Sequence, residues 1–191
     1  MSKGVSSFFI TQGIIPVEDR EIYDYSFEVL ISTVLSFLAL FVFALLSKTL
    51  FYALFFLAGF MPLRLVAGGY HAKSHSRCFL ILMGIYALLL LAIYILTFFS
   101  MIIVIAMIVI VSVLMVFLFA PSEDKNNPVS TENKNKYKKK SRLFIVFYAT
   151  FIFSLLVIVP DKSIAFSIAA GVLSVSISLL ANFIKYRKQI K

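Results

Sequence analysis

The most restrictive feature of the sequence is an apolar run from Phe79 to Ala120 that contains no charged residue and no histidine. About 20 apolar residues in a helix span a bilayer, so this run is long enough for two crossings, and we expect the turn near Thr97–Met101. Hydrophobic residues make up 61% of the 191-residue chain, more than is usual for a soluble domain. The sequence therefore predicts an all-α, multi-pass membrane protein with a single integral-membrane domain over residues 1–191.

We expect about six hydrophobic helical segments, and the four outside the long run are Ser26–Ser47, Thr49–Leu63, Leu143–Val159 and Ser163–Ile184. The second segment is short, because we expect it to end at Pro62 after roughly 15 residues, which is marginal for a full crossing. Residues 1–25 mix apolar and acidic side chains. They predict an amphipathic segment at the membrane interface, broken near Gly13 and Pro16, and no cleavable signal peptide.

The basic residues predict the orientation. Seven lie in the polar stretch 121–142 and four more in the C-terminal tail (Lys125, Lys134, Lys136, Lys138, Lys139, Lys140, Arg142; Lys185, Arg187, Lys188, Lys191). Basic residues mark cytoplasmic loops, so we expect 121–142 to be an exposed cytoplasmic loop. Two crossings return the chain to the same side, so the polar interruption 61–78 is also cytoplasmic. A second role of these charges is to attract anionic lipid or an acidic partner, and not a nucleic acid, because the cluster lies between two membrane spans.

The interruption contains the stretch RLVAGGYHAKSHSRC, Arg64 to Cys78, which holds both histidines and the only cysteine of the chain. A single cysteine excludes an internal disulfide. Two histidines and one cysteine with no nearby acid are a thin ligand set, so we expect no metal and no cofactor. The alternative to a reactive site is a buried apolar thiol beside interfacial histidines.

The position of Cys78 favours a reactive thiol. It opens the third hydrophobic segment, where Ser74 or Ser76 could cap the helix. The positive end of the helix dipole would then favour the thiolate, and the charges of Lys73 and Arg77 act in the same direction.

A nucleophilic cysteine usually needs a base, and two histidines are available. His71 is seven residues before Cys78, which on one continuous helix is roughly 10.5 Å of rise and too far for a hydrogen bond. His71 therefore requires a break in the helix, which the pair Gly68 and Gly69 favours. His75 would lie beside Cys78 on a helix surface. The spacing alone does not choose between them.

Three further residues could support the chemistry. The backbone N–H groups at Gly68 and Gly69 could stabilise an oxyanion. Arg64 could place its charge at the interface or bind a carboxylate. From the residues alone, the site predicts a membrane cysteine hydrolase or acyl-transferase.

This stretch resembles the accessory gene regulator B (AgrB) family of membrane cysteine endopeptidases in Gram-positive quorum sensing. The matching residues are Arg64, Gly68, Gly69, Tyr70, His71, Ala72 and Cys78, followed after the fourth segment by Ala120-Pro121 and a Lys-rich stretch. The resemblance implies a multi-pass protein of the Gram-positive cell membrane with its active site on the cytoplasmic side.

The resemblance also implies the reaction. Cys78 attacks the peptide bond before the acidic tail of an AgrD-like propeptide, His71 activates it, and the peptide is held as a thioester. The propeptide's own Cys or Ser then closes a thiolactone or lactone ring. Arg64 and Gly69 match positions on which the family relies, whereas His75 is left as a spectator.

Two expectations concern partners. The acidic tail would be drawn to basic residues at the cytoplasmic face, for which the candidates are Arg77, Lys138, Lys139 and Lys140. The family suggests a homodimer. Small residues in the sixth segment mark either an internal contact or a dimer face (Ser167, Gly171, Ser174, Ser178).

Two other classes of function compete with the enzyme. A non-enzymatic peptide transporter or export subunit would use the interruption as a gate, but the third and fourth segments lack the ionisable groups common in transporters. A structural or sensor subunit would bind an acidic partner through the basic residues and leaves the motif unexplained.

Overall fold

The computed structural model describes residues 2–68, 75–96, 98–122 and 131–190, without some of their side chains, among them those of 75–78. The elements are α1 (Ser2–Thr11), the short 3₁₀ helix η1 (Val17–Asp19), α2 (Arg20–Leu46), α3 (Leu50–Ala67), α4 (His75–Ile95), α5 (Phe98–Phe119), α6 (Thr131–Ile158) and α7 (Lys162–Ile190). No strand occurs in the described ranges. Five helical spans are long and apolar enough to cross a bilayer, and α4 contributes a shorter apolar helix, Phe79–Ile95. The all-α membrane fold is confirmed.

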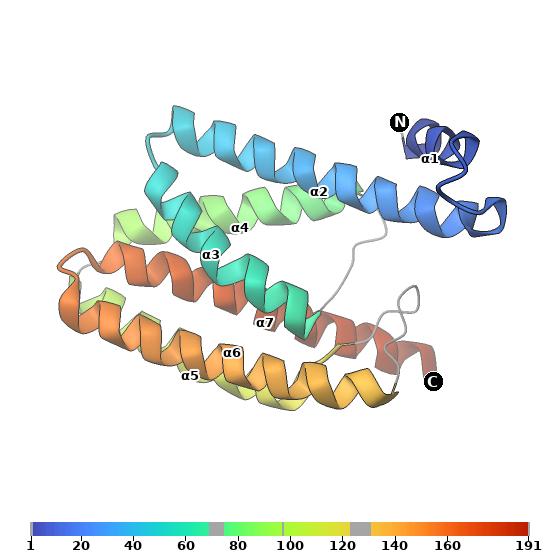
Figure 1. Ribbon diagram of the computed structural model, residues 1–191. Coiled ribbons are helices and arrows are strands. Elements are labelled where there is room, and N and C mark those ends of the chain that lie inside the picture. The colour runs from blue at the N-terminus through green and yellow to red at the C-terminus, as the bar shows by residue number, and fades with distance from the viewer. Residues whose placement is uncertain (1, 69–74, 97, 123–130, 191) are drawn as a thin grey trace.

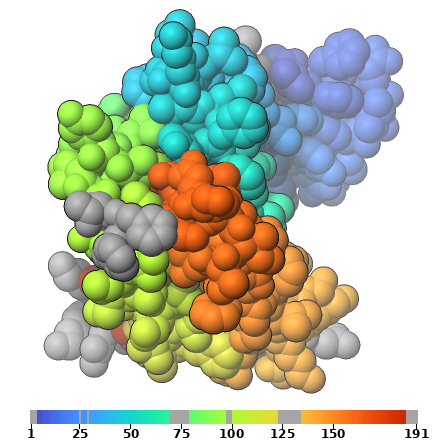
Figure 2. Space-filling model, turned by 90° about the vertical axis from the view of Figure 1, so that its left-hand side faces the viewer, coloured from blue at the N-terminus to red at the C-terminus, as the bar shows by residue number. Residues whose placement is uncertain are grey.

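Helices α2 to α7 run in alternating directions, so their ends gather at two opposite ends of the bundle (Figure 1). The basic end is where α3, α5 and α7 finish and α2, α4 and α6 begin, and its described basic side chains are Arg20, Arg64, Lys134, Lys136, Lys138, Lys139, Lys140, Arg142 and Lys185. The short-turn end, seen face-on in Figure 2, holds the connections after Leu46, Ile95 and Ile158 and the basic residues Lys48 and Lys162. The N-terminal helix α1 lies toward the basic end (Figure 1).

Helix α7 is the centre of the bundle, because 61% of its span is buried, against 17–28% of the other four. It packs directly on the backbone of α3: a Cβ atom on Gly171 would lie 2.2 Å from the Phe56 carbonyl oxygen, and one on Gly59 would lie 2.4 Å from the Ile168 carbonyl oxygen. Small residues permit this approach. Of the small residues in the sixth segment, Ser167, Gly171 and Ser174 are buried inside the protomer, so they form an internal contact.

The second segment is longer than predicted. We expected it to end at Pro62, but α3 continues through Pro62 to Ala67. Leu63 and Ala67 are completely buried. Tertiary packing therefore overrides the local cost of a proline that lacks a backbone N–H. The 18 residues of α3 are enough for a crossing.

The predicted boundaries of the polar stretch 121–142 were also wrong. Helix α6 begins at Thr131, so the basic residues from Lys134 to Arg142 lie on its first turns and not in a loop. Lysine and glutamate are good helix formers, and the helix continues without a break into the apolar span. Similarly, α2 begins at Arg20 and α7 continues to Ile190, beyond the apolar limits.

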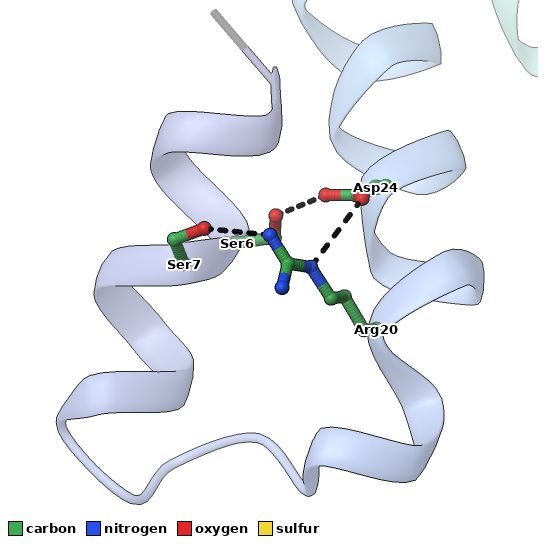
Figure 3. Close-up of polar contacts among 4 residues, drawn as sticks. All are labelled: Ser6, Ser7, Arg20 and Asp24. Carbon is green, nitrogen blue, oxygen red and sulfur yellow. Dashed lines mark hydrogen bonds and ion pairs between the residues drawn. The ribbon is translucent and has the colours of Figure 1, made fainter.

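The N-terminal segment folds back on α2, as Figure 3 shows. The Ser6 hydroxyl donates to Asp24, Arg20 Nη2 donates to Ser7 Oγ over 3.2 Å, and Arg20 Nε lies 3.9 Å from Asp24 Oδ2. The turn uses Gly13 in the left-handed region, with φ of 69°. The predicted break near Gly13 and Pro16 is therefore confirmed.

Candidate active site

Only part of the predicted site falls within the described residues. Arg64 and Gly68 are described completely, whereas Arg77 and Cys78 are described as backbone within α4. The other candidates, Gly69, His71, Lys73 and Ser74, lie outside the described residues, so their roles stay predictions.

Helix α4 begins at His75, which puts the backbone of Cys78 in the first turn. This is the position that was expected to favour a thiolate. Ser76 lies inside the helix and therefore cannot be its N-cap. His75 lies within α4, whereas His71 precedes the helix in the sequence.

The C-terminal end of α3 is held by other segments. The Val66 carbonyl accepts from Ser141 Oγ of α6 over 3.1 Å, and the Ala67 carbonyl accepts from the Ser122 N–H over 3.0 Å. The last carbonyls of a helix have no partner within the helix, so these bonds replace the missing ones. They fix the point at which the chain leaves α3 toward His71.

Gly68 is the residue at which the chain leaves. Its φ of 74° lies in the left-handed region, which favours glycine. An added Cβ would also be 2.7 Å from the Ser122 carbonyl oxygen, so both the backbone conformation and the available space require glycine. Its N–H donates to the Arg64 carbonyl over 3.0 Å. That N–H is therefore already used within the protein, which does not favour the predicted role of Gly68 as an oxyanion donor.

Arg64 is tied into the protein rather than extended to the interface. Its Nη1 donates to the Gly68 carbonyl over 3.2 Å and also to the hydroxyl of Ser178 on α7. The amide of Asn182, one turn further along α7, donates to the hydroxyl of Ser122. Sequence reasoning missed the roles of Ser122, Ser178 and Asn182. An available signal was Asn182, a polar residue near the end of an apolar helix.

The basic residues of α6 lie next to Ser141, which bonds the end of α3. Residues 134–140 are all exposed, and the next residue, Ser141, is completely buried where it bonds Val66. Arg142 Nη2 donates to the Phe117 carbonyl over 3.3 Å, and its guanidinium lies 5.0 Å from the centre of the Phe117 ring. The exposed basic side chains within 134–140 are therefore next in the sequence to the residue that holds the end of α3.

The described residues contain no group of three His, Cys, Asp or Glu side chains that could hold a metal ion. The sequence supplies one cysteine and two histidines between the end of α3 and the first turn of α4.

Comparisons with known proteins identify similar sequences. The family model described as accessory gene regulator B matches residues 2–179. An AgrB-like protein of Clostridium perfringens (strain SM101 / Type A) is 33% identical over 169 residues, which cover 81% of this chain and 78% of the relative. AgrB-like protein 2 of Clostridium perfringens (strain 13 / Type A) is 32% identical over 142 residues, which cover 71% of this chain and 65% of the relative. No solved structure matches the chain.

Proposed function

Because the chain belongs to the accessory gene regulator B family, we propose that it is a membrane cysteine endopeptidase and acyl-transferase that processes an AgrD-like quorum-sensing propeptide. It works in the cell membrane of a Gram-positive bacterium, with its site facing the cytoplasm. The observation that carries the proposal is the place of Cys78 in the first turn of α4, at the end of the bundle where the basic residues gather.

The first step cleaves the propeptide. His71 takes the proton of Cys78, and the sulfur attacks the carbonyl carbon before the acidic tail. The C–N bond breaks, and His71 returns the proton to the departing amine. The tail leaves with a free amino terminus, and the rest of the peptide stays on Cys78 as a thioester.

The second step closes the ring. A thiol or hydroxyl of the propeptide attacks the thioester carbonyl and gives its proton to His71, and the Cys78 sulfur departs. One amide has been exchanged for one thiolactone or lactone, and no water is consumed. Water must therefore be kept from the thioester, since hydrolysis would release a linear peptide.

The basic residues of α6 support the choice of substrate. An acidic tail is attracted to the exposed Lys138, Lys139 and Lys140. The following residue, Ser141, holds the end of α3 through Val66, so a tail bound there lies close to the chain that leads to His71. This arrangement supports charge recognition close to the proposed cleavage site.

The homodimer is also a proposal. Because Ser167, Gly171 and Ser174 of α7 are buried inside the protomer, these small residues do not form the dimer face. Chemical cross-linking in lipid vesicles tests it, and a purely monomeric species would contradict it.

The test is to reconstitute the protein in lipid vesicles with the candidate propeptide encoded beside it, and to follow the masses of the products. We expect the wild type to release the tail and to form a cyclic product one water lighter than the linear peptide. Cys78→Ala should form neither product while remaining folded. If Cys78→Ala processes the peptide normally, the nucleophile is wrong, and the peptide-transporter alternative takes its place.

A further inference from the structure

Two polar residues of α7, Ser178 and Asn182, each hold a different segment at the basic end. They are four residues apart and so lie on one face of the helix. Ser178 accepts a hydrogen bond from Arg64 of α3, and Asn182 donates one to Ser122, which follows α5.

Both bonds lead to the same point in the chain. Arg64 also donates to the Gly68 carbonyl over 3.2 Å, and the Ser122 N–H donates to the Ala67 carbonyl over 3.0 Å. The Ser122 carbonyl faces the position that a Cβ on Gly68 would occupy, at 2.7 Å. Ala67 and Gly68 are therefore bonded by Arg64 and Ser122, and each of these two residues is hydrogen-bonded to α7.

Helix α7 can hold these bonds in a fixed position, since it is the most buried of the five spans. Only 7% of Asn182 is exposed, and a buried amide is stable only when it is hydrogen-bonded. Loss of the bond to Ser122 therefore costs free energy of folding. The bond holds the connection after α5 against α7.

We propose that Ser178 and Asn182 are positioning residues for the reaction: they fix the exit of the chain from α3, three residues before His71. This inference rests on the proposed cysteine chemistry. The proposal assigns neither residue a contact with the acidic tail, so their loss should slow the chemical step and leave the binding of the tail unchanged. Misplacement of a catalytic group by about 1 Å can cost up to roughly a hundredfold in rate.

The experiment compares Ser178→Ala and Asn182→Ala with the matched control Ser174→Ala. Ser174 lies one turn before Ser178 on α7, and its hydroxyl donates to the Ala170 carbonyl of its own helix over 2.7 Å. Ser178→Thr keeps a hydroxyl and tests rescue. The full-length proteins are studied in lipid vesicles.

Two rates are measured for each variant. The first is release of the tail from a synthetic candidate propeptide, resolved into kcat and KM. The second is alkylation by N-ethylmaleimide, which reports on Cys78 alone because the chain has one cysteine. Alkylation needs no substrate and follows the thiolate.

We expect Ser178→Ala and Asn182→Ala to lower kcat by roughly tenfold or more, with KM nearly unchanged. Alkylation of Cys78 should slow by roughly threefold, because the thiolate is less well placed beside His71. Ser174→Ala and Ser178→Thr should match the wild type. Rates for Ser178→Ala and Asn182→Ala that equal those of Ser174→Ala would overturn the inference.

Two arms keep the outcomes distinct. If Asn182→Ala does not fold, Ser122→Ala removes the same bond from a residue outside the helices and must give the same loss of kcat. If Cys78→Ala still processes the peptide, the proposed function fails, and the positioning role, which rests on it, fails with it. If Cys78→Ala is inactive but Ser178→Ala keeps the wild-type kcat and alkylation rate, the proposed function stands and the positioning role alone is rejected.

Discussion

The two ends of the bundle are closed in different ways. At the short-turn end the bonds are mostly local: Thr49 N–H donates to the Ala44 carbonyl over 2.8 Å, and Lys162 Nζ donates to the carbonyls of Leu156 and Val159 over 2.7 and 2.6 Å. A hydrogen bond also joins Thr49 to Tyr86, which is 37 residues away.

At the basic end the bonds join distant parts of the sequence. Arg64 and Ser178 are 114 residues apart, Val66 and Ser141 are 75 apart, and Ser122 and Asn182 are 60 apart. The connections there are also longer, since α3 ends at Ala67 and α4 begins at His75. The comparison teaches that local turns are enough to close the helices at one end, whereas tertiary contacts fix the end at which α4 begins with Cys78 in its first turn.

The largest expected effect separates the two histidines, His71 and His75. His71→Ala should lower the rate of tail release by about 10²- to 10⁴-fold, because the thiol loses its base. His75→Ala is the matched control and should stay near the wild-type rate. A strong loss in His75→Ala with normal activity in His71→Ala would reverse the assignment.

The next effect concerns Gly68. Gly68→Ala should lower the rate of tail release by at least roughly tenfold, because the new Cβ would meet Ser122 at 2.7 Å in a left-handed conformation. Gly84→Ala is the control, since nothing lies within 4 Å of a Cβ built there. Equal activity of the two variants would mean that the exit from α3 does not control the reaction.

Neutralising the basic residues should have a smaller effect, on substrate binding. A triple variant with Gln at positions 138, 139 and 140 should raise KM by roughly tenfold at low salt and by less at high salt, because screening weakens the attraction of an acidic tail. The matching triple Arg variant keeps the charge and should retain the wild-type KM. Unchanged processing by the Gln variant at low propeptide concentration would exclude this role.

The smallest effect is expected at the short-turn end. Thr49→Val removes the hydroxyl that lies 2.9 Å from Tyr86 Oη and should lower the free energy of unfolding by about 1 kcal/mol or less. Tail release should be unchanged. Thermal unfolding in detergent measures the first quantity, and a loss of activity without a loss of stability would show that the two ends are coupled.

Much of the fold could be predicted from the sequence because it follows from local composition. The charge-free run predicted two helices, and these are α4 and α5, with the break between Ile95 and Phe98. Helix ends were harder to predict. Pro62 was expected to stop α3, and the residues of 134–142 were expected in a loop, because neither the burial of Leu63 nor the continuation of α6 can be read from a local pattern.

The sequence by itself determined that the chain is an all-helical membrane protein with its reactive residues collected between Arg64 and Cys78, because apolar length and residue type are properties of short segments. Only the tertiary structure decided what holds that segment. Ser122, Ser178 and Asn182 meet the end of α3 because buried polar groups must find partners, and in a helical bundle those partners come from distant helices.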